Sequence, residues 1–193
     1  MFARNDAANA SAANRGGMPP PNDSGDGGKM LDLSVIMENN ECYARNQAPG
    51  YPWTNLMIGD SRLGCKSDAD EQLILHISFR EFVKVHSLKF TEFNNGLNPE
   101  ENPTRIHIYV NRENLGFEDA EDVTPEQTLE LTAADLRETA DNLVLKFVKF
   151  QRVKSITFFI EDNAGGDVSA LGALKMYGRP VATTNMKEFK KQG

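Results

Sequence analysis

Short apolar runs separated by turn-forming residues fill the chain between residues 30 and 180. In these runs apolar and polar residues alternate with a period of two, which is typical of β-strands that bury one face. Because only Arg80 and Glu81 separate the first two runs, we expect those runs to be antiparallel neighbours joined by a tight connection. The clearest runs are LILHISF at 73–79, FVKVHSLKF at 82–90, RIHIYV at 105–110 and TLEL at 128–131.

The alternation assigns the side chains of these strands to two faces. A histidine on the outer face is a solvated imidazole by default. We expect the inner face to pack into the core through Leu73, Leu75, Ile77, Phe79, Ile106, Ile108, Val110, Leu129 and Leu131. We expect the outer face to carry His76, Ser78, Arg105, His107 and Tyr109.

Two later segments, LVLKFVKF at 143–150 and SITFFI at 155–160, are apolar at nearly every position. Such runs are typical of central strands, so we expect two strands covered on both faces and joined by a turn at QRVK. The last strand is expected near ALGALKMYG, and the best helical segment is FEDAED at 117–122. Thr132 is expected to cap a turn with Asp135. About seven or eight strands predict an all-β fold, a jelly-roll β-sandwich of two antiparallel sheets.

The two ends of the chain differ in composition from the strand-rich part. Residues 1–29 consist mainly of Ala, Asn, Gly, Pro, Ser and Asp, so we expect a disordered N-terminal tail. We expect residues 30–180 to form the sandwich domain and residues 181–193 to form a C-terminal tail. In that tail a single helical turn would present Met186 and Phe189 on one side. The turn either packs on its own sandwich or docks on a partner, and the spacing does not choose between them.

Composition and charge limit the function classes. The chain has 193 residues, 39% of them hydrophobic, which suits one domain with a single core. Its formal net charge of −7 argues against nucleic-acid and anionic-membrane partners, because phosphate binding needs clustered Lys and Arg. No run approaches the roughly 20 apolar residues of a membrane span, and the start lacks the apolar core of a secretory signal. We therefore expect a protein of the cytoplasm or nucleus and, without a coiled-coil pattern, a monomer.

An acidic cluster lies directly before the first clear strand. Asp68, Asp70 and Glu71 resemble the start of a calcium loop, but the central Gly and the closing Glu of such a loop are missing. Carboxylates also collect at strand ends, where one can accept backbone N–H bonds. We favour the start of a strand over a calcium site and predict no metal-binding residue.

The histidines and cysteines form no catalytic motif. His76, His86 and His107 are the only histidines, and none belongs to an HExxH motif or a serine-hydrolase elbow. Cys42 and Cys65 lie outside any CxxC pair, so we expect free thiols that behave as small hydrophobes. The alternative for them is a mixed disulfide with a partner. We predict no catalytic or cofactor-binding residue and no enzyme activity.

Aromatic residues supply an alternative ligand site. Tyr51 and Trp53 lie in the loop-like segment YARNQAPGYPW, where they would form a platform on which a sugar ring stacks. In the other interpretation, which we favour, Trp53 closes one end of the sandwich. A carbohydrate-binding module is therefore the second hypothesis for function.

Several segments together resemble the PITH domain, the proteasome-interacting domain found at the C-terminus of a thioredoxin-like protein and also as a stand-alone protein. They follow one another in order from Leu31 to Lys191. The most specific are DEQL before its strand and the closing pattern GxPVxxTNMxxFK. The segments are ECYARN, SDADEQLILHISF with VKVHSLKF, NNG with IHIYVN, FEDAED with PEQTLELT, LKFVKFQRVKSITFFIEDN and YGRPVATTNMKEFKK.

The resemblance implies a galactose-binding-like jelly roll with no catalytic centre and no cofactor, which agrees with the strands expected from alternation. It also implies association with the regulatory particle of the 26S proteasome. We expect Met186 and Phe189 to be the apolar anchors of that binding, with Thr184, Asn185 and Lys190 beside them. The sequence contains no CxxC motif, so we do not expect the redox activity of the two-domain relatives.

Overall fold

The computed structural model describes residues 30–95 and 98–181 of the chain. It contains one short α-helix, α1 (Phe117–Asp122), and five 3₁₀ turns: η1 (Leu33–Ile36), η2 (Asn39–Glu41), η3 (Trp53–Met57), η4 (Pro99–Glu101) and η5 (Phe147–Phe150). The strands are β1 (Leu31–Asp32), β2 (Tyr43–Arg45), β3 (Cys65–Lys66), β4 (Leu73–Thr91), β5 (Pro103–Val110), β6 (Gln127–Glu130), β7 (Leu143–Val144), β8 (Val153–Asn163), β9 (Ala170–Leu171) and β10 (Ala173–Pro180).

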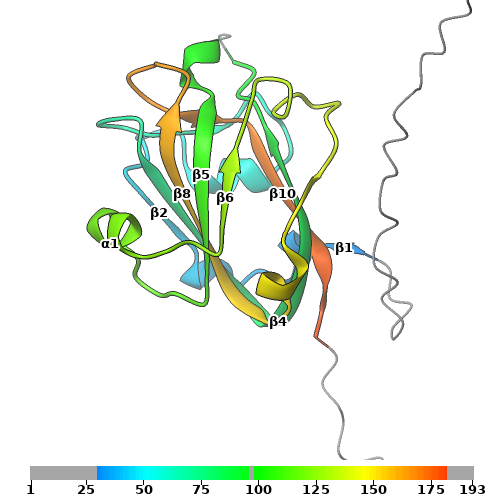
Figure 1. Cartoon of the computed structure of the whole chain (residues 1–193). Helices are drawn as coiled ribbons and strands as arrows, with labels where there is room; N and C mark the ends of the chain where they lie inside the picture. The colour runs from blue at the N-terminus through cyan, green and yellow to red at the C-terminus, as the bar shows by residue number, and fades with distance from the viewer. Residues whose placement is uncertain (1–29, 96–97, 182–193) are drawn as a thin grey trace, which may run out of the picture.

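The strand β4 holds the two layers of the sandwich together. Its first half pairs with β2 and β8, placing Leu75 opposite Phe158, and its second half pairs with β10, placing Phe90 opposite Leu174. All pairs are antiparallel, and the main strand order is β1-β10-β4-β8-β5-β6. Figure 1 shows β8, β5 and β6 side by side in one layer, with β10 in the other.

The tight connection expected at Arg80 and Glu81 is wrong, because β4 runs without interruption for 19 residues. The two expected strands are the two halves of one strand, and its pairing with β8 is irregular between Ser78 and Val83. Neither Arg80 nor Glu81 favours the backbone conformations that a two-residue hairpin needs. At the irregularity the Lys154 ammonium group donates to the carbonyls of Phe79 and Arg80, so the unpaired carbonyls are satisfied.

The main core lies between the two layers and confirms the inner face assigned from alternation. The expected inward residues of β4 and β5 are buried, except that Val110 is only partly buried. Phe90 and Phe158 meet edge to face across this core, with ring centroids 5.5 Å apart. Leu129 and Leu131, from the segment around β6, are also buried in it.

A smaller core lies on the outer face of the sheet, under α1. The predicted helix is confirmed, and its buried residue Ala120 packs in one cluster with Ile74, Tyr109, Leu115 and Phe159. The Tyr109 hydroxyl donates to the Ala120 carbonyl at 2.7 Å, which fixes the helix on the sheet. Tyr109 therefore points outward, as expected, but is completely buried.

The segment 143–150 is not the expected central strand. Only Leu143–Val144 forms a strand, and Phe147–Phe150 forms the turn η5 (the yellow helical turn beside β4 in Figure 1). Leu145 and Phe150 are buried, whereas Phe147 and Val148 point to solvent. The second apolar segment, SITFFI, does lie in the central strand β8, and the expected last strand is confirmed as β9 and β10.

The turn expected after Thr132 is present. The backbone N–H and the hydroxyl of Thr132 both donate to the Asp135 carboxylate, at 2.8 and 2.6 Å. These bonds lower the pKa of Asp135 below its usual value, because they stabilise the ionised form.

Candidate functional site

The acidic segment before β4 is a turn that fixes the start of that strand. Asp70 accepts hydrogen bonds from the Gln72 backbone N–H at 3.1 Å and from the Asn46 side-chain amide at 2.8 Å. Asn46, whose φ is +62°, also donates to the Gln72 carbonyl. These contacts confirm the strand-start interpretation for Asp70, while Asp68 and Glu71 lie at the surface of the same turn. Within residues 30–95 and 98–181, no three His, Cys, Asp or Glu side chains group to hold a metal ion.

The two aromatic residues proposed for sugar stacking do not share one open platform. Trp53 begins η3, is only partly exposed and packs against the main core. Tyr51 meets Phe93 edge to face at 5.9 Å between ring centroids, and the Lys66 ammonium group lies 5.8 Å from the Tyr51 ring. This arrangement supports the interpretation in which Trp53 closes one end of the sandwich.

The residues expected to bind the proteasome lie beyond the part of the chain that the structure describes. They are Thr184, Asn185, Met186, Phe189 and Lys190. The described chain ends at Val181, whose backbone N–H donates to the Phe82 carbonyl at 2.8 Å. The C-terminal tail therefore starts beside the irregular middle of β4.

A polar pocket of about 360 Å³ opens on the outer face of the sheet, between the β2 side and the segment that follows β5. His76 forms part of its floor and is only 3% exposed, so the expectation of a solvated imidazole is wrong. Its ring stacks on the Tyr43 ring at 4.7 Å between centroids, and its Nδ1 atom lies 2.8 Å from the Thr157 hydroxyl. The pocket is lined by Glu41, Tyr43, His76, Ser78, Glu113, Asn114, Lys154 and Ser155.

The surroundings of His76 in this pocket disfavour its charged form. Burial lowers the pKa of His76 below 6.5 and outweighs the nearby carboxylates of Glu113 and Glu41, which raise it. The Ser78 hydroxyl donates to the Glu41 carboxylate at 2.8 Å. Because the Ser78 proton goes to a carboxylate, this site does not show the Ser–His pairing of a hydrolase nucleophile. The Tyr43 hydroxyl is buried and has no hydrogen-bond partner among the described residues.

Only part of this pocket was predictable from the sequence. Alternation correctly placed His76 and Ser78 on the outer face, and Thr157 lies on the neighbouring strand opposite His76. The cover over them comes from Tyr43 and Glu113, which are distant from His76 in sequence and are linked to it by no local pattern. Burial of His76 therefore depends on tertiary packing that periodicity does not report.

The other two histidines lie apart from this pocket. His107 on β5 contacts the Glu161 carboxylate and the Thr128 hydroxyl, at 3.0 and 2.8 Å, and is partly exposed. His86 on β4 is exposed. The three imidazoles thus lie in separate environments.

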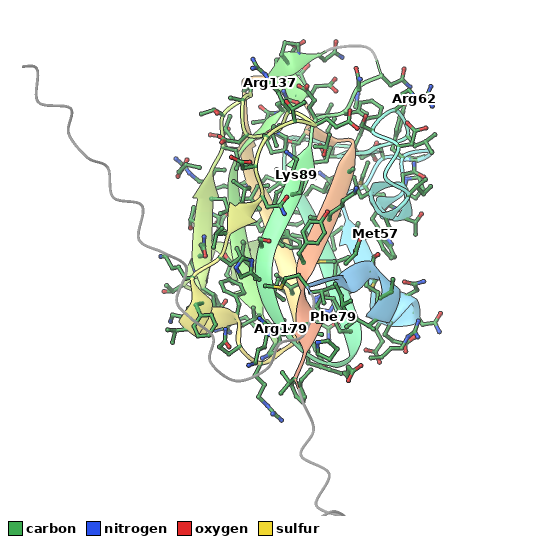
Figure 2. All side chains as sticks on the ribbon, turned by 90° about the vertical axis from the view of Figure 1, so that its right-hand side faces the viewer. Met57, Arg62, Phe79, Lys89, Arg137 and Arg179 are labelled. Carbon is green, nitrogen blue, oxygen red and sulfur yellow. The ribbon has the colours of Figure 1, made fainter. Side chains whose placement is uncertain are left out.

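Lys89 is a buried cation with a structural explanation. Its ammonium group donates to the carbonyls of Arg137 and Ala140, so it ties the long segment between β6 and β7 to β4. Figure 2 shows Lys89 beneath this segment, with Phe79 and Arg179 near the opposite end of the sandwich. We assign Lys89 to the fold and not to a ligand site.

Both cysteines are free thiols in environments that suppress reactivity. Burial raises the pKa of Cys65 to about 12, and the side chain is completely covered. Burial also raises the pKa of Cys42, against the opposing effect of a hydrogen bond with the Ser78 backbone. Because the thiolate is the reactive form, these environments disfavour the mixed-disulfide hypothesis.

The helices of the described chain are too short and polar to cross a membrane.

A protein-family model described as PITH domain matches residues 23–193. Thioredoxin-like protein 1 of Schizosaccharomyces pombe is 33% identical over 164 residues, which cover 84% of this chain and 56% of that protein. The PITH domain-containing protein GA19395 of Drosophila pseudoobscura pseudoobscura is 31% identical over 102 residues, which cover 53% of this chain and 45% of that protein. The chain thus spans about half the length of the curated relatives it matches.

Solved structures with a similar fold include carbohydrate-binding domains. A family 32 carbohydrate-binding module of Clostridium perfringens in complex with galactose has a TM-score of 0.53 at 12% identity, covering 77% of this chain and 99% of that one. A fucolectin from striped bass serum has a TM-score of 0.57 at 10% identity, covering 81% of this chain and 52% of that one. These similarities confirm the predicted all-β, galactose-binding-like jelly roll.

Proposed function

Because the chain belongs to the PITH domain family, we propose that it is a non-enzymatic protein-binding module that associates with the regulatory particle of the 26S proteasome. The observation that carries the proposal is the family match over residues 23–193, which includes the closing segment. The relation to a thioredoxin-like protein over 84% of this chain supports it further. The fold adds that the molecule is of a kind used for binding, since similar solved domains bind sugars.

Within this proposal the C-terminal tail carries the main contact. Met186 and Phe189 are its apolar anchors, because a few buried apolar side chains usually supply most of the energy of an interface. Thr184, Asn185 and Lys190 flank them and would contribute polar contacts. The tail begins at Val181, whose backbone N–H donates to the Phe82 carbonyl, so its first residue is fixed on the domain.

The chemistry of the described side chains supports a role without catalysis. In the pocket that contains the buried His76, the Ser78 hydroxyl is hydrogen-bonded to the Glu41 carboxylate. The Cys65 thiol is inaccessible. We propose that the protein acts as a monomer in the cytoplasm or nucleus and binds neither nucleic acid nor membrane, consistent with its net charge of −7.

A pull-down from cell lysate tests the proposal. The full chain and the same chain truncated after Pro180 serve as baits, and circular dichroism checks that both are folded. Recovery of regulatory-particle subunits by the full chain and their loss with the truncated chain would support the proposal and the role of the tail. If neither bait recovers these subunits, the proposal fails.

A second candidate function is carbohydrate binding through Tyr51 and Trp53, favoured by the likeness to a galactose-bound module. The contacts of the two rings weigh against it, because Trp53 packs on the core and Tyr51 faces Phe93. Trp53 is the single tryptophan, so titration of its fluorescence with galactose, fucose and N-acetylgalactosamine reports binding near it directly. Unchanged fluorescence together with a silent glycan array would remove this candidate.

A further inference from the structure

The turn η5 presents apolar side chains to solvent at a fixed place on the sandwich. Val148 is 83% exposed and Phe147 is 51% exposed, although the segment reads as a buried strand. Single exposed apolar residues are ordinary, but adjacent ones on a rigid element mark interaction surfaces more often.

The turn is held rigidly from both ends. Leu145 is buried and its backbone N–H donates to the His86 carbonyl at 2.9 Å, while Phe150 is completely buried. The Lys146 backbone N–H donates to the Gln127 side chain at 2.8 Å, and the Gln151 side chain donates to the Phe147 carbonyl at 2.7 Å. These contacts fix the outward direction of the exposed pair, so its exposure is a property of the fold.

The segment that carries the exposed pair is basic. Residues 143–154 contain four basic residues, Lys146, Lys149, Arg152 and Lys154, and no acidic residue, in a chain of net charge −7. Lys146, Lys149 and Arg152 are exposed. A local positive charge of this kind on an acidic protein favours a partner of opposite charge.

A hollow lies beside Arg152 and Lys154 of this segment. Its volume is about 370 Å³, and Phe82 and Arg152 form part of its wall. The Arg152 guanidinium group lies 4.0 Å from the centroid of the Phe82 ring, a cation–π contact that keeps the arginine beside the aromatic face. Aromatic and arginine side chains are the residues most enriched in binding hot spots. Glu113 is the one carboxylate in its lining among the described residues.

We propose that the η5 patch, formed by Phe82, Lys146, Phe147, Val148, Lys149 and Arg152, docks an acidic segment of a partner protein that carries apolar anchor residues. The apolar pair and the hollow would bury the anchors, and the lysines and Arg152 would pair with the carboxylates around them. The patch is a second contact besides the tail, and it rests on the proposed function only in that the chain is a protein-binding module.

An array of synthetic peptides of about 12 residues tests this inference with the full chain as probe. The peptides vary independently in charge, from Glu-rich to Lys-rich, and in apolar content, with Phe and Leu or with Ser in their place. Binding selective for peptides that are both acidic and apolar is expected. If no peptide binds, or if Ser-containing or Lys-rich peptides bind equally well, the inference is overturned.

Variants of the chain then locate the binding site. Their binding of the best acidic peptide is measured by fluorescence anisotropy. The double variant Phe147→Ser/Val148→Ser should raise Kd by about tenfold or more, because it removes the exposed anchors without opening the core. The charge reversal Lys146→Glu/Lys149→Glu should also raise Kd and reduce the dependence of binding on salt. The controls Val35→Ser and Lys175→Glu change an exposed valine and an exposed lysine elsewhere and should stay within about twofold.

Four results separate this inference from its rivals. Equal binding by the serine variant and the parent overturns the inference, as does self-association of the chain that the same variant abolishes, since the occupant is then a second copy. Peptide binding without any proteasome binding sustains the η5 patch and defeats the proposed function. If the patch variants bind the proteasome as well as the parent does and no peptide on the array binds, the proposed function is sustained and the η5 patch is defeated.

Discussion

Replacing Gly178 by alanine tests the packing of β10 against β4, the contact that joins the two layers. The pairing of these strands shifts between Tyr177 and Gly178, and Gly178 lies opposite Val85. A Cβ atom at Gly178 would lie 2.0 Å from the Lys84 carbonyl oxygen, where ordinary contact begins at 3.4 Å. The overlap of 1.4 Å involves backbone of a paired strand, so it cannot be relieved by rotating a side chain.

The magnitude follows from two opposing effects. Overpacking of this severity costs about 3 kcal/mol, at the upper end of the usual range. The lower entropy of the unfolded chain with alanine recovers up to about 1 kcal/mol. We therefore expect Gly178→Ala to lower the free energy of unfolding by about 2 kcal/mol or more.

Urea denaturation followed by circular dichroism measures this loss, and an unchanged m value confirms that only stability has changed. Gly116→Ala is the matched control, because its Cβ would meet only the Asp119 side chain, at 3.3 Å. The control should lose less than about 1 kcal/mol. A loss below about 0.5 kcal/mol for Gly178→Ala would refute the reasoning, because the strands would then not approach as closely as described.

Three further predictions concern the core, the buried histidine and the tail. Phe158→Ala should lower the free energy of unfolding by about 3–5 kcal/mol, because it opens a cavity beside Phe90; a thermal melt that barely moves would contradict this. Because burial lowers the folded-state pKa of His76, the unfolded chain takes up its proton first on acidification. The free energy of unfolding should thus fall as pH drops below about 6.5, and His76→Gln should flatten that dependence in urea titrations. If the slope of the free energy of unfolding against pH is unchanged in His76→Gln, other groups cause that dependence. Phe189→Ala should leave the melt unchanged and weaken proteasome binding by about 1 kcal/mol or more, measured as Kd; parental affinity or an unfolded variant would argue against the anchor role.

Alternation predicted the inner face of the sandwich well, because burial of one face is what a period of two encodes. The same alternation predicted the wrong structure where two different arrangements fit one pattern of apolar and polar residues. The pair Arg80–Glu81 between two apolar runs fits either a hairpin or one continuous strand, and only pairing with β10 on one half and β2 on the other decides for the strand. The segment 143–150 fits either a covered strand or an exposed turn, because exposed apolar side chains look like core residues in sequence.

The candidate sites were predictable to different degrees. Asp70 was recognisable as a strand-start carboxylate, since such residues act through neighbouring backbone groups. The burial of His76 depends on Tyr43 and Glu113, which no local pattern links to it. The role of Met186 and Phe189 came from family resemblance and stays a prediction, because both lie beyond the described residues.

Co-sedimentation of the purified full chain with purified proteasome particles tests the central proposal most directly. Glycerol-gradient fractions of the 26S proteasome, the isolated regulatory particle and the 20S core are compared, each mixed with the chain and with its Phe189→Ala variant. We expect the chain to migrate with the first two particles and not with the 20S core, and we expect less of the variant to migrate with them. Migration with none of the particles, or equally with the 20S core, would contradict it.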